Sequence, residues 1–229
     1  MKKIIVCLFF CALLFAENYI KVTGTGEVSF APNIAYLTIG VQSTYENAQT
    51  GQREVNENIN KFMNSLQSFV DKKDVETSAI SIQRRYEYIA QKQQFVGYDV
   101  QQLLKIKLRD FSLIGKVIDK AMSSGFNNIS SLVFSHTNPD AYEKEALKKA
   151  VEEAQTKAKE LAEVSNLKNV KIVDIDETNN KFVPLYDQNP RMMGALQMAG
   201  EGATTQVMPG ELKTSAVVQM KCTFAGGNL

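Results

Sequence analysis

The apolar residues of this chain change their spacing several times, from the alternation typical of β-strands to the three- and four-residue steps of amphipathic helices. Residues 19–45 alternate, and Ala31-Pro32-Asn33 divides them into two predicted strands. Residues 46–71 have helical spacing instead. The apolar stripe of that predicted helix consists of Val55, Ile59, Phe62, Met63, Leu66, Phe69 and Val70.

Both patterns recur through the rest of the chain. A hairpin is predicted from Ile80 to Leu108, with a polar turn at residues 90–94. A shorter helix follows, and we expect Asp110 to cap its start and Gly125 to end it. Further strands are predicted at residues 129–135, 170–176 and 212–224.

The helix predicted at residues 140–164 follows Asn138-Pro139, a capping residue and a first-turn proline. It is rich in Ala, Glu and Lys, and the alanines on its apolar stripe predict close approach to a sheet or to another helix. The predicted order is ββαββαβαββ, with a flexible loop at residues 178–209 before the last strand. This order indicates an α+β fold with mainly antiparallel sheet and with two long amphipathic helices and one shorter helix packed on one face.

The first sixteen residues predict a cleaved signal peptide. Lys2-Lys3 precede an unbroken apolar run from Ile4 to Ala16, which is too short for a stable membrane anchor. Cleavage is expected after Ala16, which would send residues 17–229 to the periplasm. Lipidation at Cys11 is the competing interpretation, but bulky Phe10 stands where a small residue is wanted.

Cleavage would leave Cys222 as the only cysteine, so no intramolecular disulfide is expected. It would also remove two lysines and no acid, and the formal net charge would change from +1 to −1. A chain so close to neutral gives no electrostatic reason to expect nucleic acid as a partner. We expect residues 17–229 to form a single domain or two intertwined subdomains.

No catalytic, cofactor-binding or metal-binding constellation is visible in the sequence. Gly24-Thr25-Gly26 lacks the third glycine and the helix of a nucleotide-binding loop, and is interpreted as strand glycines. His136, the only histidine, has no ligand-spaced partners and is expected to end a strand. Arg84-Arg85 is too small a basic footprint for nucleic acid. The acids of residues 143–163 are explained by pairing with lysines four residues away.

Two kinds of sulfur-containing side chain deserve separate interpretations. Cys222 lies mid-strand, where a buried inert thiol is the usual interpretation, and a redox sensor or an intermolecular disulfide are the alternatives. The methionines of the loop have three interpretations: a contact with a neighbouring subunit, reversible oxidant targets, or soft ligands for Cu(I). They are Met192, Met193, Met198 and Met208. Met63 and Met122 are expected in the core.

An ordered set of segments resembles the SIMPL-domain family of bacterial envelope proteins. No single motif is highly specific, but together they cover essentially all of residues 17–229. The matching segments are residues 22–26, 31–35, 74–78, 97–100, 109–110, 113–115, 150–162, 190–193 and 209–211.

The resemblance implies a periplasmic or outer-membrane-associated protein. It also implies oligomers, some of them large ring- or channel-like particles, and a link to oxidative-stress tolerance and antigenicity; it transfers no catalytic residue. We therefore expect a non-enzymatic envelope protein without cofactor, whose partners are copies of itself and outer-membrane or other envelope proteins. The alternative is a redox scavenger or soft-metal-binding protein that uses the loop methionines and Cys222.

Overall fold

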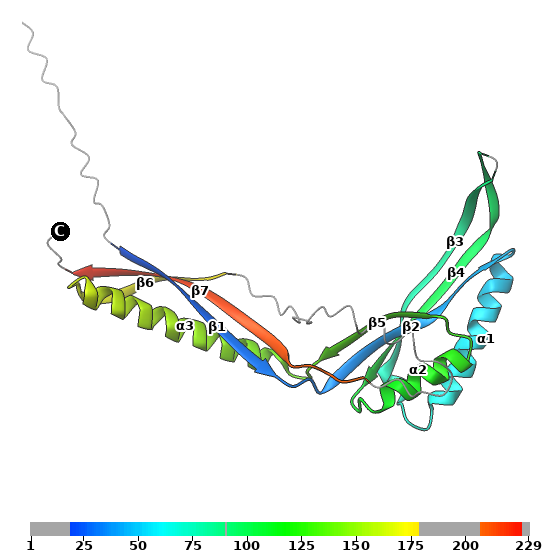
Figure 1. Ribbon diagram of the computed structural model, residues 1–229, viewed down its shortest axis with the longest axis horizontal. Helices are drawn as coiled ribbons and strands as arrows, with labels where there is room; N and C mark the ends of the chain where they lie inside the picture. The colour runs from blue at the N-terminus through cyan, green and yellow to red at the C-terminus, as the bar shows by residue number, and fades with distance from the viewer. Residues whose placement is uncertain (1–18, 90, 179–206, 226–229) are drawn as a thin grey trace, which may run out of the picture. The chain divides into compact units, whose positions relative to one another are not determined.

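The computed structural model describes residues 19–89, 91–178 and 207–225 (Figure 1). The predicted signal peptide, Cys11 and three loop methionines, Met192, Met193 and Met198, lie outside these residues. The predicted α+β class and element order are confirmed. The elements are β1 (Tyr19–Phe30), β2 (Ile34–Tyr45), α1 (Ala48–Leu66), the short 3-10 helix η1 (Lys72–Asp74), β3 (Val75–Ile89), β4 (Lys92–Leu108), α2 (Leu113–Ser123), β5 (Asn128–Ser135), α3 (Pro139–Val164), β6 (Lys168–Thr178) and β7 (Leu212–Ala225).

The described residues fold into two compact units, one drawn from residues 28–89, 91–142 and 207–214 and the other from residues 19–27, 143–178 and 215–225. The first unit contains a four-stranded sheet in the order β3-β4-β2-β5. All of its neighbouring strands are antiparallel. Both α1 and α2 lie against one face of this sheet (Figure 1), where the alternating apolar residues of the strands meet the apolar stripes of the helices. The most deeply buried side chains there include Leu37, Ile39, Val55, Phe62, Leu66, Ile106, Ile114 and Val117.

Two helix boundaries differ from prediction. Helix α1 ends at Leu66, whose carbonyl accepts the amides of both Phe69 and Val70 in a closing turn. The apolar spacing continues past the helix end because Val70 still packs into the core. Helix α2 begins only at Leu113, because the Asp110 carboxylate accepts from the amide and hydroxyl of Ser112 instead of capping the helix directly.

The hairpin of β3 and β4 also differs from prediction, because its strands are longer. β3 continues to Ile89 and β4 begins at Lys92, so the predicted polar turn at residues 90–94 is mostly strand. Gln94 and Gln93 pair with Glu87 and Tyr88. Polar side chains do not interrupt a strand that is exposed to water on both faces, so polarity alone was a poor guide to this turn.

An ion pair explains two of the segments that carry the family resemblance. The Arg109 guanidinium donates to both carboxylate oxygens of Asp74, with N–O distances of 2.7 and 3.1 Å. This fork joins the end of β4 to the short helix η1 that precedes β3. The hydrogen bonds lower the pKa of Asp74, as expected for a carboxylate that accepts two charge-assisted bonds.

The second unit contains a three-stranded sheet in the order β1-β7-β6, with α3 running along one face (Figure 1). The predicted close approach of the alanine stripe is confirmed. Fully or almost fully buried alanines recur on α3 at every fourth position from Ala146 to Ala162. The side of β7 that was predicted from alternation is also buried: Leu212, Thr214, Ala216, Val218, Met220 and Cys222.

Gly24 and Gly26 make this approach sterically feasible. A Cβ atom built on Gly24 would lie 2.0 Å from the carbonyl oxygen of Ala150, and one on Gly26 would lie 2.0 Å from that of Ala146. Both contacts are with helix backbone, which cannot rotate away as a side chain can. The two glycines of β1 are therefore required by the closeness of α3.

We predict that Gly24→Ala lowers the free energy of unfolding by about 1–3 kcal/mol, because the new methyl group must push α3 away from the sheet. Gly210→Ala is the matched control, since no atom lies within 4 Å of its added Cβ, and it should change stability by less than about 0.5 kcal/mol. Urea unfolding of residues 17–229 measures both. Equal stabilities for the two variants would contradict this packing.

Candidate functional site

Cys222 is buried in the core between α3 and the three-stranded sheet, where it packs with Val22, Ala154, Ala158 and Met220. Its side chain is 0% exposed, and burial raises the pKa of the thiol. Since the thiolate is the reactive form, this environment opposes a role as a redox sensor.

The methionines have contrasting environments. Met208 is 75% exposed, whereas the other predicted loop methionines, Met192, Met193 and Met198, lie outside the described residues. The prediction that Met122 lies in the core is wrong: it continues the apolar spacing of α2, but it is 55% exposed and the buried residues of the helix end at Ala121. Met220 is fully buried.

His136 follows the last residue of β5 and lies against the stacked rings of Phe30 and Tyr142. It makes edge contacts with Phe30 and Tyr142, at centroid distances of 5.8 and 5.0 Å, and its Nδ1 accepts the amide of Asn138. Through these contacts the imidazole of His136 stabilises the turn between β5 and α3. Among the described residues, no group of three or more His, Cys, Asp or Glu side chains is placed to hold a metal ion.

The two arginines of β3 are held by different partners. Tyr86, and to a smaller extent Tyr98, raise the pKa of the Arg84 guanidinium. The Arg85 guanidinium lies 3.1 Å from the Glu87 carboxylate. The charge of Arg85 is therefore balanced by Glu87, and the two arginines do not form a basic surface for nucleic acid.

The outer edge of β1 is covered by charged side chains of α3. The carboxylate of Glu153 accepts both the backbone amide and the hydroxyl of Thr25. Lys157 donates to the carbonyl of Thr23 at 3.0 Å, and Lys149 donates to the carbonyl of Glu27 at 3.4 Å. Three backbone groups on this edge of β1 thus bond to side chains spaced four residues apart on one helix.

Glu153 is held as a carboxylate by this arrangement. The backbone amide of Thr25, then Lys157 and the Thr25 hydroxyl, lower the pKa of Glu153 to about 2. Lys157 also forms an ion pair with Glu153 at 3.0 Å. An unpaired strand edge can template the addition of another strand, so these side chains close β1 to such pairing.

The opposite edge of the sheet is formed by β6, and it is open among the described residues. No hydrogen bond from another described element reaches the outer side of β6. Ten of its residues are exposed, and Val170 is the exception, being half-buried. Three large apolar side chains on this strand are 44–54% exposed: Ile172, Val173 and Ile175. This edge is the candidate functional site, and its chemistry is that of strand addition.

Sequence reasoning missed both edges. The acids and lysines of residues 143–163 were interpreted as solvated pairs along the helix, and three such pairs exist, including Lys149 with Glu145 at 3.3 Å. The sequence pattern that could have indicated these edge contacts is the recurrence of Lys149, Glu153 and Lys157 on one stripe of the helix, beside the buried alanines. Sequence alone does not show that a strand edge lies opposite that stripe.

The chain matches the family model of SIMPL, described as a protein of unknown function (DUF541), over residues 20–222. This chain belongs to the SIMPL family. The predicted resemblance is therefore confirmed, and the match covers all three α-helices and all or most of each of the seven strands described above.

Several curated proteins are similar to this chain. The "26 kDa periplasmic immunogenic protein" of Brucella melitensis biotype 1 is 29% identical over 172 residues, covering 72% of this chain and 69% of the relative. The "Uncharacterized protein YggE" of Escherichia coli strain K12 is 30% identical over 145 residues, or 63% of this chain and 59% of the relative. YggE of Edwardsiella ictaluri is 23% identical over 190 residues, or 82% and 79%. In the described part of this SIMPL protein, no helix has the length and apolarity needed to cross a bilayer.

We predict that the Glu153 contact makes stability depend on pH. The folded-state pKa of about 2 lies below the ordinary value of 4.5, so the contribution is complete above about pH 4.5 and is lost as pH falls toward 2. Glu153→Gln should flatten the fall of the melting temperature over this interval. Glu152→Gln, which removes an exposed carboxylate paired with Lys148, is the control and should keep the wild-type slope. Identical slopes for all three proteins would contradict the contact.

Proposed function

We propose that this SIMPL protein is a non-enzymatic periplasmic protein that assembles with copies of itself through β6. The supporting observation is the asymmetry of the three-stranded sheet, in which α3 closes the edge of β1 and no described residue covers the edge of β6. The similarity to a Brucella protein named periplasmic supports the compartment. Association with the outer membrane stays a prediction of the family resemblance.

The charges of β6 favour a second copy in antiparallel orientation. The first part of the strand carries Lys168 and Lys171, and the second part carries Asp174, Asp176 and Glu177. Two antiparallel copies place the basic part of each against the acidic part of the other, whereas parallel copies place like charges together. Opposite charges across a strand pair each contribute about 0.2–1 kcal/mol, and like charges cost a similar amount.

The apolar residues of β6 add a reason for the strand to be covered. Ile172 and Val173 lie between the basic and acidic parts and Ile175 lies within the acidic part, so a two-fold pair brings the apolar residues near the middle of both strands together. Burying such side chains contributes about 25 cal/mol per Å² of apolar surface. Charged ends around an apolar centre also discourage pairing with unrelated strands.

Reversing the charges at one end of β6 tests this assembly. We predict that Lys168→Glu/Lys171→Glu and Asp176→Lys/Glu177→Lys each weaken self-association about tenfold or more, since up to four charge pairs become repulsive. A 1:1 mixture of the two variants should restore association. The β7 partners of these residues are Ala225, Thr223, Gln219 and Val218, so the substitutions place no like charges directly opposite each other across β6 and β7. Light scattering on a sizing column with residues 17–229 measures the outcome.

The control is Lys144→Glu/Lys159→Glu, which changes the net charge by the same amount as Lys168→Glu/Lys171→Glu but at exposed positions of α3. It should assemble as wild type does. A wild-type monomer at all concentrations, or assembly unaffected by either β6 variant, would contradict the proposal.

Deleting residues 189–208 separately tests a contribution of the methionine loop, and retained assembly in that deletion would exclude a loop-mediated contact.

Methionine-based scavenging is the second candidate function, and the exposure of Met208 favours it. We predict that mild peroxide converts Met208 and Met122 to sulfoxide at least tenfold faster than Met220, which is fully buried. Peptide mass spectrometry measures the three rates. If Met122 is oxidised as fast as Met208, solvent exposure alone explains both rates. Protection of cells from peroxide by the wild type but not by Met208→Leu would favour scavenging as a function. Equal rates for Met220 would contradict its burial.

A further inference from the structure

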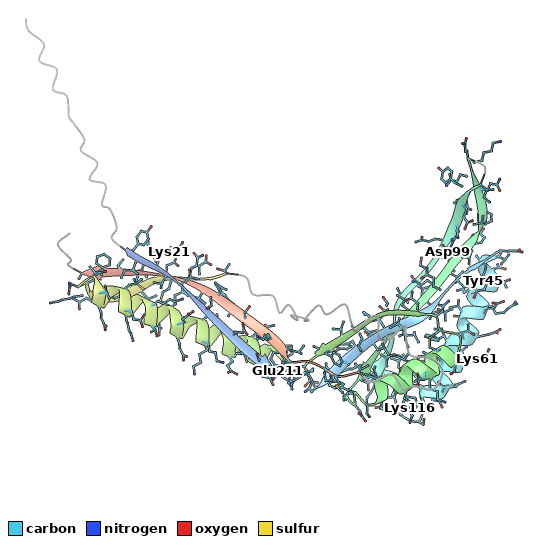
Figure 2. The ribbon with its side chains drawn as sticks, viewed as in Figure 1. Lys21, Tyr45, Lys61, Asp99, Lys116 and Glu211 are labelled. Carbon is cyan, nitrogen blue, oxygen red and sulfur yellow. The ribbon has the colours of Figure 1, made fainter. Side chains whose placement is uncertain are left out.

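An open pocket of about 260 Å³ lies on the four-stranded sheet, and only polar side chains line it. They come from three strands and from the start of β5: Gln42, Ser43, Thr44, Arg85, Asp99, Asn127 and Asn128. Tyr45 and Val100 contact Gly51 of α1, so their neighbours Thr44 and Asp99 project from the opposite face, which α1 and α2 leave uncovered. Asp99 on β4 is labelled in Figure 2.

Gln42 is fixed in this pocket by amides on both sides. Its Oε1 accepts from Gln101 and from Asn128, both at 3.1 Å. Its backbone amide donates to Asn127 Oδ1, and its carbonyl accepts from Asn127 Nδ2, so the Asn127 side chain extends the sheet as a short strand would. The Gln42 Nε2 group makes no hydrogen bond within the described residues, so it can donate a hydrogen bond to a ligand.

Arg85 and Asp99 form the second half of the lining. One carboxylate oxygen of Asp99 accepts the Thr44 hydroxyl at 2.6 Å and lies 3.5 Å from Arg85 Nη1. The Nε and Nη2 atoms of Arg85 lie 3.2 and 3.1 Å from Glu87. The second oxygen of Asp99 makes no hydrogen bond within the described residues, so it offers an acceptor near the Gln42 donor.

These contacts exclude three classes of ligand. An anion needs a free cationic fork, but each nitrogen of Arg85 is already engaged by Asp99, Thr44 or Glu87. A metal ion needs several carboxylate or imidazole ligands, and Asp99 is the only such group in the lining. An apolar ligand would meet no apolar side chain there.

We propose that this pocket binds a neutral sugar. A sugar hydroxyl both donates and accepts hydrogen bonds, and the pocket offers amide donors, amide oxygens and one carboxylate oxygen. The two charged residues of its lining, Arg85 and Asp99, have opposite charges. Hydrogen bonds already hold these side chains, so little conformational entropy is lost on binding. The volume is below the usual 300–1,000 Å³ of sites for drug-sized ligands, as suits about one sugar ring. This inference goes beyond self-assembly and does not depend on β6.

Nuclear magnetic resonance of the side-chain NH₂ groups tests the site directly, with N-acetylglucosamine, glucose and sodium phosphate as separate probes. We expect at least one sugar to shift the NH₂ signals of Gln42, Gln101 and Asn128, and phosphate to leave them unchanged. Co-sedimentation with purified cell-wall glycan distinguishes a polymeric source from a free sugar. The β6 charge variants should bind as wild type does, so failure of assembly and failure of this site remain distinguishable.

Gln42→Ala and Asp99→Asn should each weaken sugar binding at least tenfold. Gln52→Ala, an exposed position on α1, is the matched control and should bind as wild type does. The backbone spectra report whether each variant is folded, and either of the two pocket variants suffices for the test. The proposal is overturned if neither sugar moves the three signals, if phosphate displaces the sugar, or if both folded pocket variants bind with wild-type affinity.

Discussion

The close approach of α3 to β1 is the contact on which the rest of the second unit depends. Gly24 and Gly26 present no side chain, and the buried alanines of α3 present only a methyl group, so the two backbones nearly touch. At this separation the lysines and the glutamate beside the alanine stripe reach past the sheet to the groups of the strand edge. A bulkier residue on either element would withdraw Lys149, Glu153 and Lys157 from β1.

The consequence is a sheet with one open edge among its described strands. A sheet with two open edges could add strands at both sides and grow without limit, which is the route to aggregation. A sheet that is closed at β1 and open at β6 can pair once, around a two-fold axis, and the pair then has no further free edge of this kind. The basic and acidic parts of β6 would face each other in that antiparallel pair. In the proposed assembly, α3 closes one edge of the sheet and β6 provides the contact between copies.

Local patterns were enough to predict most of the fold. Alternation and helical spacing placed all ten long elements in order, because the apolar residues of strands and helices recur with different periods. They failed at the ends of elements, where local hydrogen bonds or core packing decide where a helix begins and ends. Asp110 bonds Ser112, and Val70 follows the core after its helix has ended. Met122 continues the apolar spacing of α2, but the described residues leave it 55% exposed.

The candidate sites were less predictable than the fold, for a physical reason. Gln42, Arg85, Asp99 and Asn127 are far apart in the sequence, and only the register of β2, β3 and β4 brings them into one pocket. Likewise, Glu153 looks like any surface carboxylate until the amide of Thr25 lies beside it. Family membership supplied the class of protein, but it gave no residue for either site.

Hydrogen exchange followed at several protein concentrations tests the central claim most directly. The account predicts that the Thr25 amide of β1 is protected at every concentration, because Glu153 holds it within each protomer. Amides on the outer side of β6 should exchange rapidly in dilute protein and become protected as the protein assembles. Fast exchange at Thr25, or protection of β1 amides that appears only on assembly while β6 stays unprotected, would contradict the account.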